Sequence, residues 1–125
     1  MYLADTSALI ALRKGSETGK KVEKATGNAQ LAVASISVFE LLDGASDSEV
    51  KQTEQLLMQS DLLAFDDETA RISADLSKQL KISGKTVPQL DLFIASIALK
   101  YRLPLVTLDG DFERIPNLKV TVVKP

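Results

Sequence analysis

The stretch MYLADTSALIAL, residues 1–12, sets a single carboxylate, Asp5, between two apolar runs. The run before Asp5 is typical of a short buried strand, and the run after it is typical of a buried helix that Thr6 or Ser7 could cap. Asp5 would then lie at the carboxyl end of a strand, where open α/β sheets bind their ligands. A carboxylate between apolar segments is costly unless it is paired, hydrated or bound to a cation, although Asp5 could also simply cap the helix.

The composition excludes several kinds of chemistry. A chain of 125 residues with 45% hydrophobic and 26% charged residues is typical of a globular protein, and we expect one domain over residues 1–125. The chain has no Cys and no His, which excludes disulfides, thiolate or imidazole catalysis, and zinc sites built from these residues. Any metal must be held by oxygen, which favours Mg²⁺ or Mn²⁺.

The net charge of −2 says little about partners. If four of the 17 acids hold a metal, the other 13 face 15 Lys and Arg residues, which is compatible with a nucleic-acid partner. The apolar start is too short to span a bilayer and is interrupted by Asp5. We therefore expect a cytoplasmic protein without a membrane contact.

Short apolar strands alternate with amphipathic helices along the whole chain. Strands are predicted at 2–4, 31–34, 62–65, 105–107 and 120–123. Helices are predicted at 8–14, 17–25, 35–43, 47–59, 67–82 and 88–101. This alternation is typical of a parallel sheet with helices on both faces. We predict the α/β class: a three-layer α/β/α sandwich around a central parallel sheet of four to five strands.

Four carboxylates fall at junctions that such a sheet gathers at one edge. Asp5 ends the first strand, and Glu40 is expected in the first turn of the helix after the second strand. Asp91 is expected in the first turn of the helix at 88–101, and Asp109 follows the strand at 105–107. Several carboxylates close together cannot all stay ionised unless a cation lies among them. A divalent ion in such a site suits the hydrolysis of phosphodiesters.

Each of these acids also has an ordinary structural explanation. Ser37 and Glu40 match the capping box S-x-x-E, which would tie Glu40 to the start of its own helix. Asp91 would be favoured by the helix dipole, and Asp109 begins a D-G turn dipeptide. Asp111, two residues further on, is a fifth candidate for the same site.

Four motifs, in this order, resemble those of the PIN-domain ribonucleases and, among them, of the compact VapC-type toxins. The motifs are DTS at 5–7, SISVFELLDG at 35–44, DLFIASIA at 91–98 and LVTLDGDF at 105–112. The resemblance covers nearly the whole chain. It implies a PIN-like fold and a metal-dependent endoribonuclease that is the toxin of a VapBC-type toxin–antitoxin system.

The resemblance also assigns roles to individual positions. It implies a catalytic cluster of four acids: Asp5, Glu40, Asp91 and Asp109. It implies that Mg²⁺, or Mn²⁺ in its place, binds to four carboxylates: Asp5, Asp91, Asp109 and Asp111. Whether Asp109 or Asp111 lies closer to the metal is left open. Three hydroxyls look suited to hold these carboxylates or a phosphate, or else to cap helices: Thr6, Ser7 and Thr107.

The same resemblance implies RNA as the substrate, a homodimer, and a VapB-type antitoxin that inserts a basic side chain among the acids. The apolar segments 39–42 and 56–58 could receive that partner or belong to the core. Five cations near the N-terminus could attract the RNA backbone, or could simply be solvated: Arg13, Lys14, Lys20, Lys21 and Lys24.

Two other classes of protein fit the sequence less well. A non-catalytic PIN-like module that binds RNA or protein would be favoured by the loss of Asp5 or Asp91, and both are present. A phospho-acceptor receiver domain has a similar length and sheet. It requires paired acids after the first strand and an acceptor aspartate after the third, where this chain has only Asp66, a helix cap.

Overall fold

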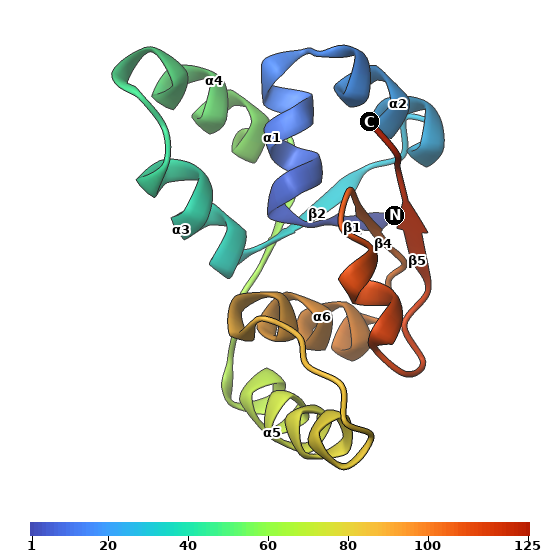
Figure 1. Ribbon diagram of the computed structural model, residues 1–125. Helices are drawn as coiled ribbons and strands as arrows, with labels where there is room; N and C mark the ends of the chain where they lie inside the picture. Colours follow the sequence, from blue (N-terminus) through green and yellow to red (C-terminus); the bar gives the residue numbers. More distant parts are fainter.

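A five-stranded parallel sheet forms the centre of the computed structural model, which describes residues 1–125 (Figure 1). Its strands are β1 (Tyr2–Ala4), β2 (Leu31–Ala34), β3 (Asp61–Leu63), β4 (Leu105–Thr107) and β5 (Val120–Val122). They lie in the order β3-β2-β1-β4-β5, and all four pairings are parallel. The predicted parallel sheet is confirmed, and β1, with Asp5 at its carboxyl end, is its central strand.

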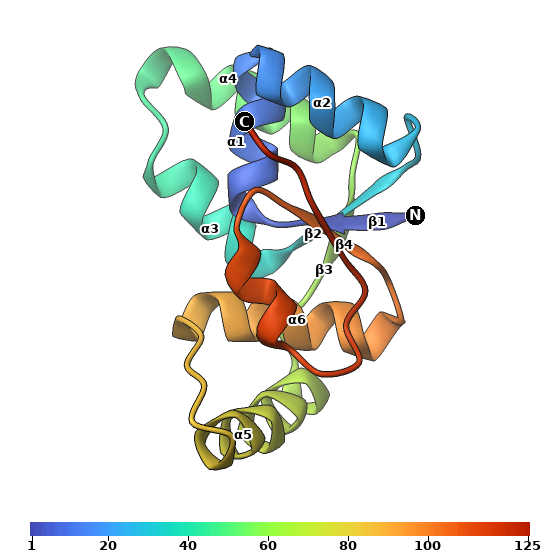
Figure 2. The ribbon, with the colours of Figure 1, turned by 45° about the vertical axis from the view of Figure 1, so that its right-hand side comes forward.

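Helices cover both faces of this sheet. They are α1 (Thr6–Lys14), α2 (Glu17–Thr26), α3 (Ser35–Asp43), α4 (Asp47–Met58), α5 (Asp67–Ile82), α6 (Gln89–Tyr101) and the short 3-10 helix η1 (Gly110–Arg114). Figures 1 and 2 show α1, α2 and α4 on one side of the sheet and α5 and α6 on the other. The predicted three-layer arrangement is confirmed. No helix combines the length and the apolar character needed to cross a bilayer.

The strands are apolar on both sides because each side faces a layer of helices. In β1, Leu3 packs into the core beneath α5 and α6, whereas Ala4 packs into the core beneath α1. In β4, Leu105 and Val106 divide between the same two cores. Successive side chains of a strand point to opposite faces, so each short strand contributes to both cores.

Several predicted details of the helix starts are wrong. Of the caps considered for α1, Asp5 is the one that forms and Thr6 and Ser7 are not: the Asp5 side chain accepts a hydrogen bond from the Ala8 N–H. The capping box between Ser37 and Glu40 does not form, because α3 begins directly after β2 and places Glu40 in its second turn rather than its first. Glu40 is therefore free to contact other elements.

Two further boundaries differ from the prediction. Pro88 precedes α6 as its N-cap instead of occupying the first helical position, as suits a proline with extended backbone. Strand β3 ends at Leu63, two residues before the predicted end. Phe65 lies beyond the strand, where the centroid of its ring is 4.5 Å from that of Phe93 on α6.

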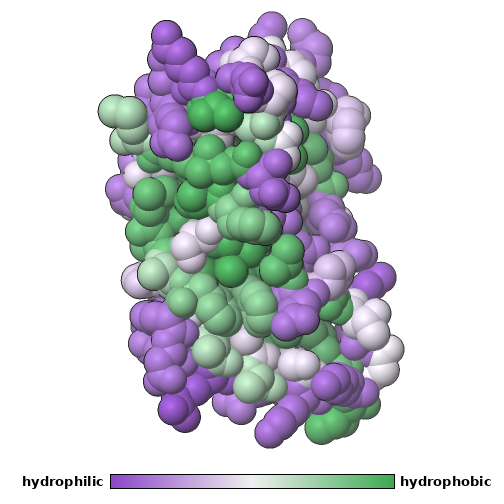
Figure 3. All heavy atoms as spheres, turned by 90° about the vertical axis from the view of Figure 1, so that its left-hand side faces the viewer, coloured by the Kyte–Doolittle hydropathy of each residue, from purple (hydrophilic) through white to green (hydrophobic).

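One face of the molecule carries a broad apolar area (Figure 3). Three exposed apolar side chains lie on α3, at the end of α4 and on the edge strand β3: Phe39 is 63% exposed, Met58 84% and Leu62 57%. We call these three residues the apolar face. A large exposed apolar surface usually marks an interface with another molecule.

Candidate active site

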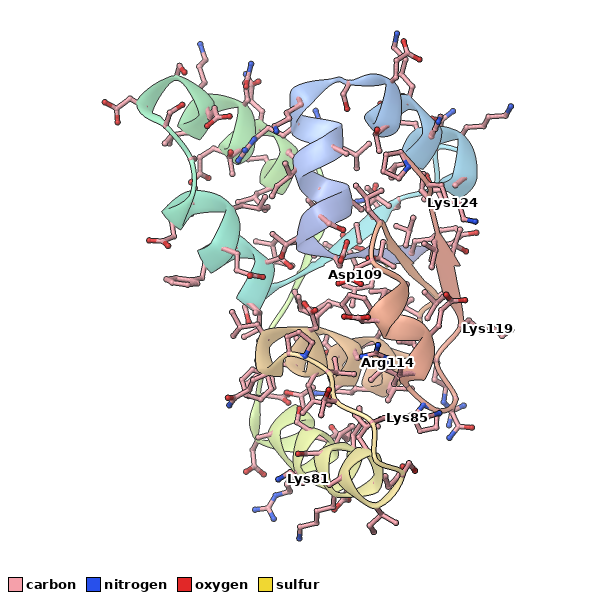
Figure 4. All side chains as sticks on the ribbon, in the orientation of Figure 1. Lys81, Lys85, Asp109, Arg114, Lys119 and Lys124 are labelled. Atoms are coloured by element: carbon pink, nitrogen blue, oxygen red, sulfur yellow. The ribbon has the colours of Figure 1, made fainter.

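The predicted acids gather at the carboxyl edge of the sheet. Asp5 follows β1 and Asp109 follows β4, which are neighbouring strands. The helix α6 begins at the same edge, with Asp91 in its first turn. Figure 4 shows Asp109 beside the start of α1, between the two helical layers. The topology thus brings together residues that are far apart in the sequence.

Asp5 is the most deeply buried of these acids, with only 4% of its surface exposed. One carboxylate oxygen, Oδ1, accepts hydrogen bonds from the Ala8 N–H at 3.0 Å and from the Ser7 hydroxyl at 2.8 Å. The other, Oδ2, accepts one from the Thr107 hydroxyl at 2.7 Å. Burial raises the pKa of Asp5 above its ordinary value, although these hydrogen bonds partly oppose the shift.

Thr107 links Asp5 to Asp109. Its hydroxyl donates to Asp5 and accepts a hydrogen bond of 2.9 Å from the Asp109 N–H. The Ser7 hydroxyl accepts a further bond of 3.1 Å from the Leu108 N–H. These contacts tie the loop after β4 to the start of α1, so the two acids are held in a fixed relation. The predicted role of Ser7 and Thr107 as hydroxyls that hold carboxylates agrees with this geometry.

Glu40 is held by the third predicted hydroxyl. The Thr6 hydroxyl donates to Glu40 Oε1 at 2.6 Å, and it lies 2.9 Å from the hydroxyl oxygen of Ser37. Glu40 therefore interacts with the first turn of α1 and not with the start of its own helix. Its half-buried carboxylate is directed toward the same edge of the sheet as Asp5.

Asp91 shows most clearly that the acids share one electrostatic environment. Its pKa is raised from 3.8 to about 6, first by burial and then by the negative charges of four other acids: Asp5, Asp109, Glu40 and Asp111. Asp91 therefore lies within the electrostatic influence of all four other candidate carboxylates. Like charges this close favour either protonation or the binding of a cation.

This shift makes the stability of the metal-free protein depend on pH. The folded-state pKa of Asp91, about 6, lies above the ordinary value of 3.8, so between these pH values the folded protein keeps a proton that the unfolded chain has lost. The contribution of Asp91 to the free energy of unfolding is therefore largest below about pH 4 and falls as the pH rises through 6. We expect Asp91→Asn to melt at a higher temperature than the wild type at neutral pH in EDTA.

Thermal melts followed by circular dichroism at several pH values would measure this difference. The advantage of Asp91→Asn should shrink as the pH falls from about 6 to about 4, because the side chain of the folded wild type then also becomes neutral. Asp75→Asn, at an exposed position on α5, is the matched control and should show no such change. An advantage of Asp91→Asn that does not depend on pH would contradict the assignment.

Asp111 forms an ion pair with Arg114, a residue that the sequence analysis did not identify. Arg114 Nη2 lies 3.3 Å from Asp111 Oδ1, and Arg114 Nη1 donates to the backbone oxygen of Thr86 at 2.8 Å. Arg114 thus joins η1 to the segment before α6. The spacing of Asp111 and Arg114, three residues apart on one helical turn, was the available sequence signal.

Two of the five N-terminal cations that could attract RNA or simply be solvated, Arg13 and Lys20, are engaged in ion pairs. Arg13 is buried, with only 6% of its side chain exposed, and its Nη2 lies 3.4 Å from Glu49 Oε2 on α4. It holds α1 against α4 and is not available to a substrate. Lys20 forms an exposed ion pair with Glu17 within α2, a helix that lies away from the acids.

The carboxylate oxygens of the site suit a hard divalent ion, although they do not converge on one point. Every candidate ligand is a carboxylate oxygen, the kind that Mg²⁺ and Mn²⁺ prefer. No three acids of the chain meet closely enough to hold one ion together. Mg²⁺ usually keeps several waters and takes only one or two carboxylates, so it does not require such convergence. The negative charges that raise the pKa of Asp91 repel one another, and a bound cation would reduce this repulsion.

Comparison with known proteins agrees with this geometry. Ribonuclease VapC of Rickettsia bellii is 35% identical over 97% of this chain and 95% of that protein. Ribonuclease VapC5 of Mycobacterium tuberculosis is 31% identical over 86% of this chain and 82% of that protein. A toxin–antitoxin complex from Klebsiella pneumoniae contains a chain with the same fold, at a TM-score of 0.78 and 26% identity over 97% of this chain and 96% of that one.

The match to a family is equally extensive. The sequence model of the PIN domain covers residues 2–118, which include all five candidate acids and the three hydroxyls that hold them. The match therefore spans the first four strands of the sheet and the edge at which the acids lie. The chain belongs to the PIN domain family.

Proposed function

We propose that this chain is a metal-dependent endoribonuclease and the toxin of a VapBC-type toxin–antitoxin pair. The observation that carries the proposal is the acidic cluster of Asp5, Glu40, Asp91 and Asp109, in which burial and then the charges of the neighbouring acids raise the pKa of Asp91 to about 6. The curated relatives support it, since both are ribonucleases of the VapC type. A cluster of oxygen ligands without His or Cys suits phosphodiester hydrolysis better than acyl transfer.

Four carboxylates are the proposed ligands of Mg²⁺ or Mn²⁺: Asp5, Asp91, Asp109 and Asp111. When bound, the divalent ion supplies Lewis-acid activation of water and neutralises charge on the phosphate. Thr107 and Ser7 orient Asp5 for this role through the hydrogen bonds at 2.7 and 2.8 Å. Because these hydroxyls fix the carboxylate before any ligand arrives, the site is partly preorganised.

Glu40 is the proposed base that orients or deprotonates the attacking water. The Thr6 hydroxyl engages only its Oε1 atom, so Oε2 is available to accept a proton. Asp109 is the other carboxylate that could take this part, because its Oδ1 is occupied by the Asp111 N–H at 2.9 Å while Oδ2 is not. In-line attack of water on phosphorus with breakage of the P–O3′ bond and protonation of the departing 3′ oxygen, as the family resemblance implies, would leave fragments with 5′-phosphate and 3′-hydroxyl ends.

We also propose a homodimer and a VapB-type antitoxin as partners. The apolar face supplies exposed apolar surface for an interface, which isolated proteins rarely leave uncovered. The acidic cluster would favour a basic side chain of an inhibitor for the same electrostatic reason that it favours a cation. The similar chain from Klebsiella pneumoniae belongs to a toxin–antitoxin complex.

An assay of RNA cleavage tests the proposed activity. Purified protein is incubated with a structured RNA in Mg²⁺, in Mn²⁺ or in EDTA, and the ends of the fragments are determined. We expect cleavage with either metal and none in EDTA. The double variant Asp5→Asn/Asp91→Asn, purified in parallel, controls for contaminating ribonucleases. Equal cleavage by that variant, or cleavage that persists in EDTA, contradicts the proposal. RNA binding without cleavage would favour a non-catalytic PIN-like module.

A further inference from the structure

The surface around the acidic cluster is electrostatically asymmetric. Residues 77–90, which end α5 and lead into α6, contain three lysines and no acid. Residues 43–54, on the opposite side of the cluster at the end of α3 and in α4, contain four acids and one lysine. A polyanion would be repelled by the second segment and attracted by the first.

We propose that the RNA strand reaches the acidic cluster along a basic track formed by Lys81, Lys85 and Arg114. The proposal rests on the proposed function, because it names the path of the substrate to that site. Figure 4 shows the three side chains one after another: Arg114 on η1, nearest to Asp109, then Lys85, and then Lys81 at the end of α5. The track thus begins beside the acids and leads away from α3 and α4.

Contacts and surface hollows connect the members of the track. Arg114 is paired with Asp111 at 3.3 Å and bonded to the Thr86 carbonyl at 2.8 Å, so it lies between the cluster and the segment that carries Lys85. Lys85 and Arg114 line one hollow of about 520 Å³, and Lys81 and Lys85 line a second, smaller one. Glu113 is the one acid that lines either hollow.

The two lysines of the track are free to bind phosphate. Both are exposed, and neither takes part in any of the six ion pairs of the protein. Lys81 also lies in the last turn of α5, where a cation ordinarily stabilises the helix dipole. Lys24 has the same position in α2 and is likewise exposed and unpaired, which makes it a matched comparison.

Binding of RNA, separate from its cleavage, provides the test. A fluorescein-labelled single-stranded RNA is titrated with protein in the Asp5→Asn background, and anisotropy is followed between 50 and 200 mM KCl. The variants are Lys81→Gln/Lys85→Gln and, as control, Lys21→Gln/Lys24→Gln, which remove the same charge. Each phosphate contact to a single strand contributes about 0.7 to the slope of log K against log salt.

We expect the Lys81→Gln/Lys85→Gln variant to lower that slope by about 1.4 and to weaken binding about 25-fold near 0.1 M salt, because two phosphate contacts are lost. The control should bind within about twofold of its parent. In the cleaving background the track variant should raise KM and leave kcat unchanged. If both double variants weaken RNA binding equally, the effect is one of general charge and the track is overturned. If neither variant weakens RNA binding, the track is also overturned. Loss of binding by the track variant alone, with no cleavage by the wild type, would retain the track and refute the nuclease.

Discussion

Replacing Asp5 with asparagine is expected to abolish RNA cleavage without destabilising the fold. Asparagine has the size of aspartate and still presents an oxygen to the Ala8 N–H, which Asp5 accepts at 3.0 Å. The negative charge is lost, and with it the ability to hold a divalent ion. Removing a single oxyanion-hole hydrogen-bond donor from an enzyme lowers kcat by about 10²–10³-fold, and we expect the loss of a metal-holding charge to cost at least as much.

The stability of Asp5→Asn should be equal to or higher than that of the wild type. Burial raises the pKa of Asp5, which means that its charge is unfavourable in the folded protein. The amide nitrogen would face Thr107, whose hydroxyl can accept as well as donate, so the hydrogen bond at 2.7 Å can be kept with reversed direction. Folding and activity are thus expected to separate in this variant.

Cleavage rates in Mg²⁺ and melting curves in EDTA would measure the two effects. Asp75→Asn, at an exposed position on α5, serves as control and should retain both the activity and the stability of the wild type. Undiminished cleavage by Asp5→Asn would exclude Asp5 from the site. A marked loss of its stability would instead show that the carboxylate is needed for folding, and the loss of activity would then say nothing about chemistry.

The predictable part of this site is the part that depends on local pattern. The alternation of apolar strands and helices sufficed to predict a parallel sheet, and Asp5 and Asp109 could be placed at its edge because each directly follows an apolar strand. The family motifs then singled out Glu40 and Asp91 among 17 acids. Their electrostatic coupling in the structure agrees with that choice.

Two contacts that the sequence did not predict join segments that are far apart in the chain. Ser37 and Glu40 have the spacing of a capping box, but the nearest hydroxyl to Glu40 comes from Thr6, 34 residues earlier in the chain. Arg13 looked like a solvated helix terminus, and its partner Glu49 lies 36 residues away. Spacing along one helix cannot reveal such pairs, because they depend on how α1 packs against α3 and α4.

Gly19 is expected to be the most sensitive position of the fold outside the site. It is a buried residue of α2, at the point where this helix crosses α1. A Cβ atom at this position would lie 2.3 Å from the carbonyl oxygen of Ala11 and 2.9 Å from its carbonyl carbon. Both are backbone atoms of α1, so no side-chain rotation can relieve the clash, and α1 and α2 would have to separate.

We therefore expect Gly19→Ala to destabilise the protein, the opposite of the usual effect in a helix. Replacing a glycine in a helix interior by alanine ordinarily gains about 1 kcal/mol, and Gly19, in the first turn of α2, would gain at most that much. Overpacking against fixed atoms costs roughly 1–3 kcal/mol or more, and here it also removes apolar contacts between two helices. We expect a net loss of about 2 kcal/mol in the free energy of unfolding, measured by urea denaturation.

Gly110→Ala is the matched control, because a Cβ there would meet only the Glu113 side chain at an ordinary 3.5 Å. Its free energy of unfolding should stay within about 0.5 kcal/mol of the wild type. Since α1 begins with the cap residue Asp5 and carries Thr6, a displacement of α1 by Gly19→Ala should also disturb the bond from Thr6 to Glu40. Cleavage should then fall even at temperatures where the variant is fully folded. A variant as stable as the wild type would show that α1 and α2 can part without cost, and that the close contact at Ala11 does not hold this side of the site in place.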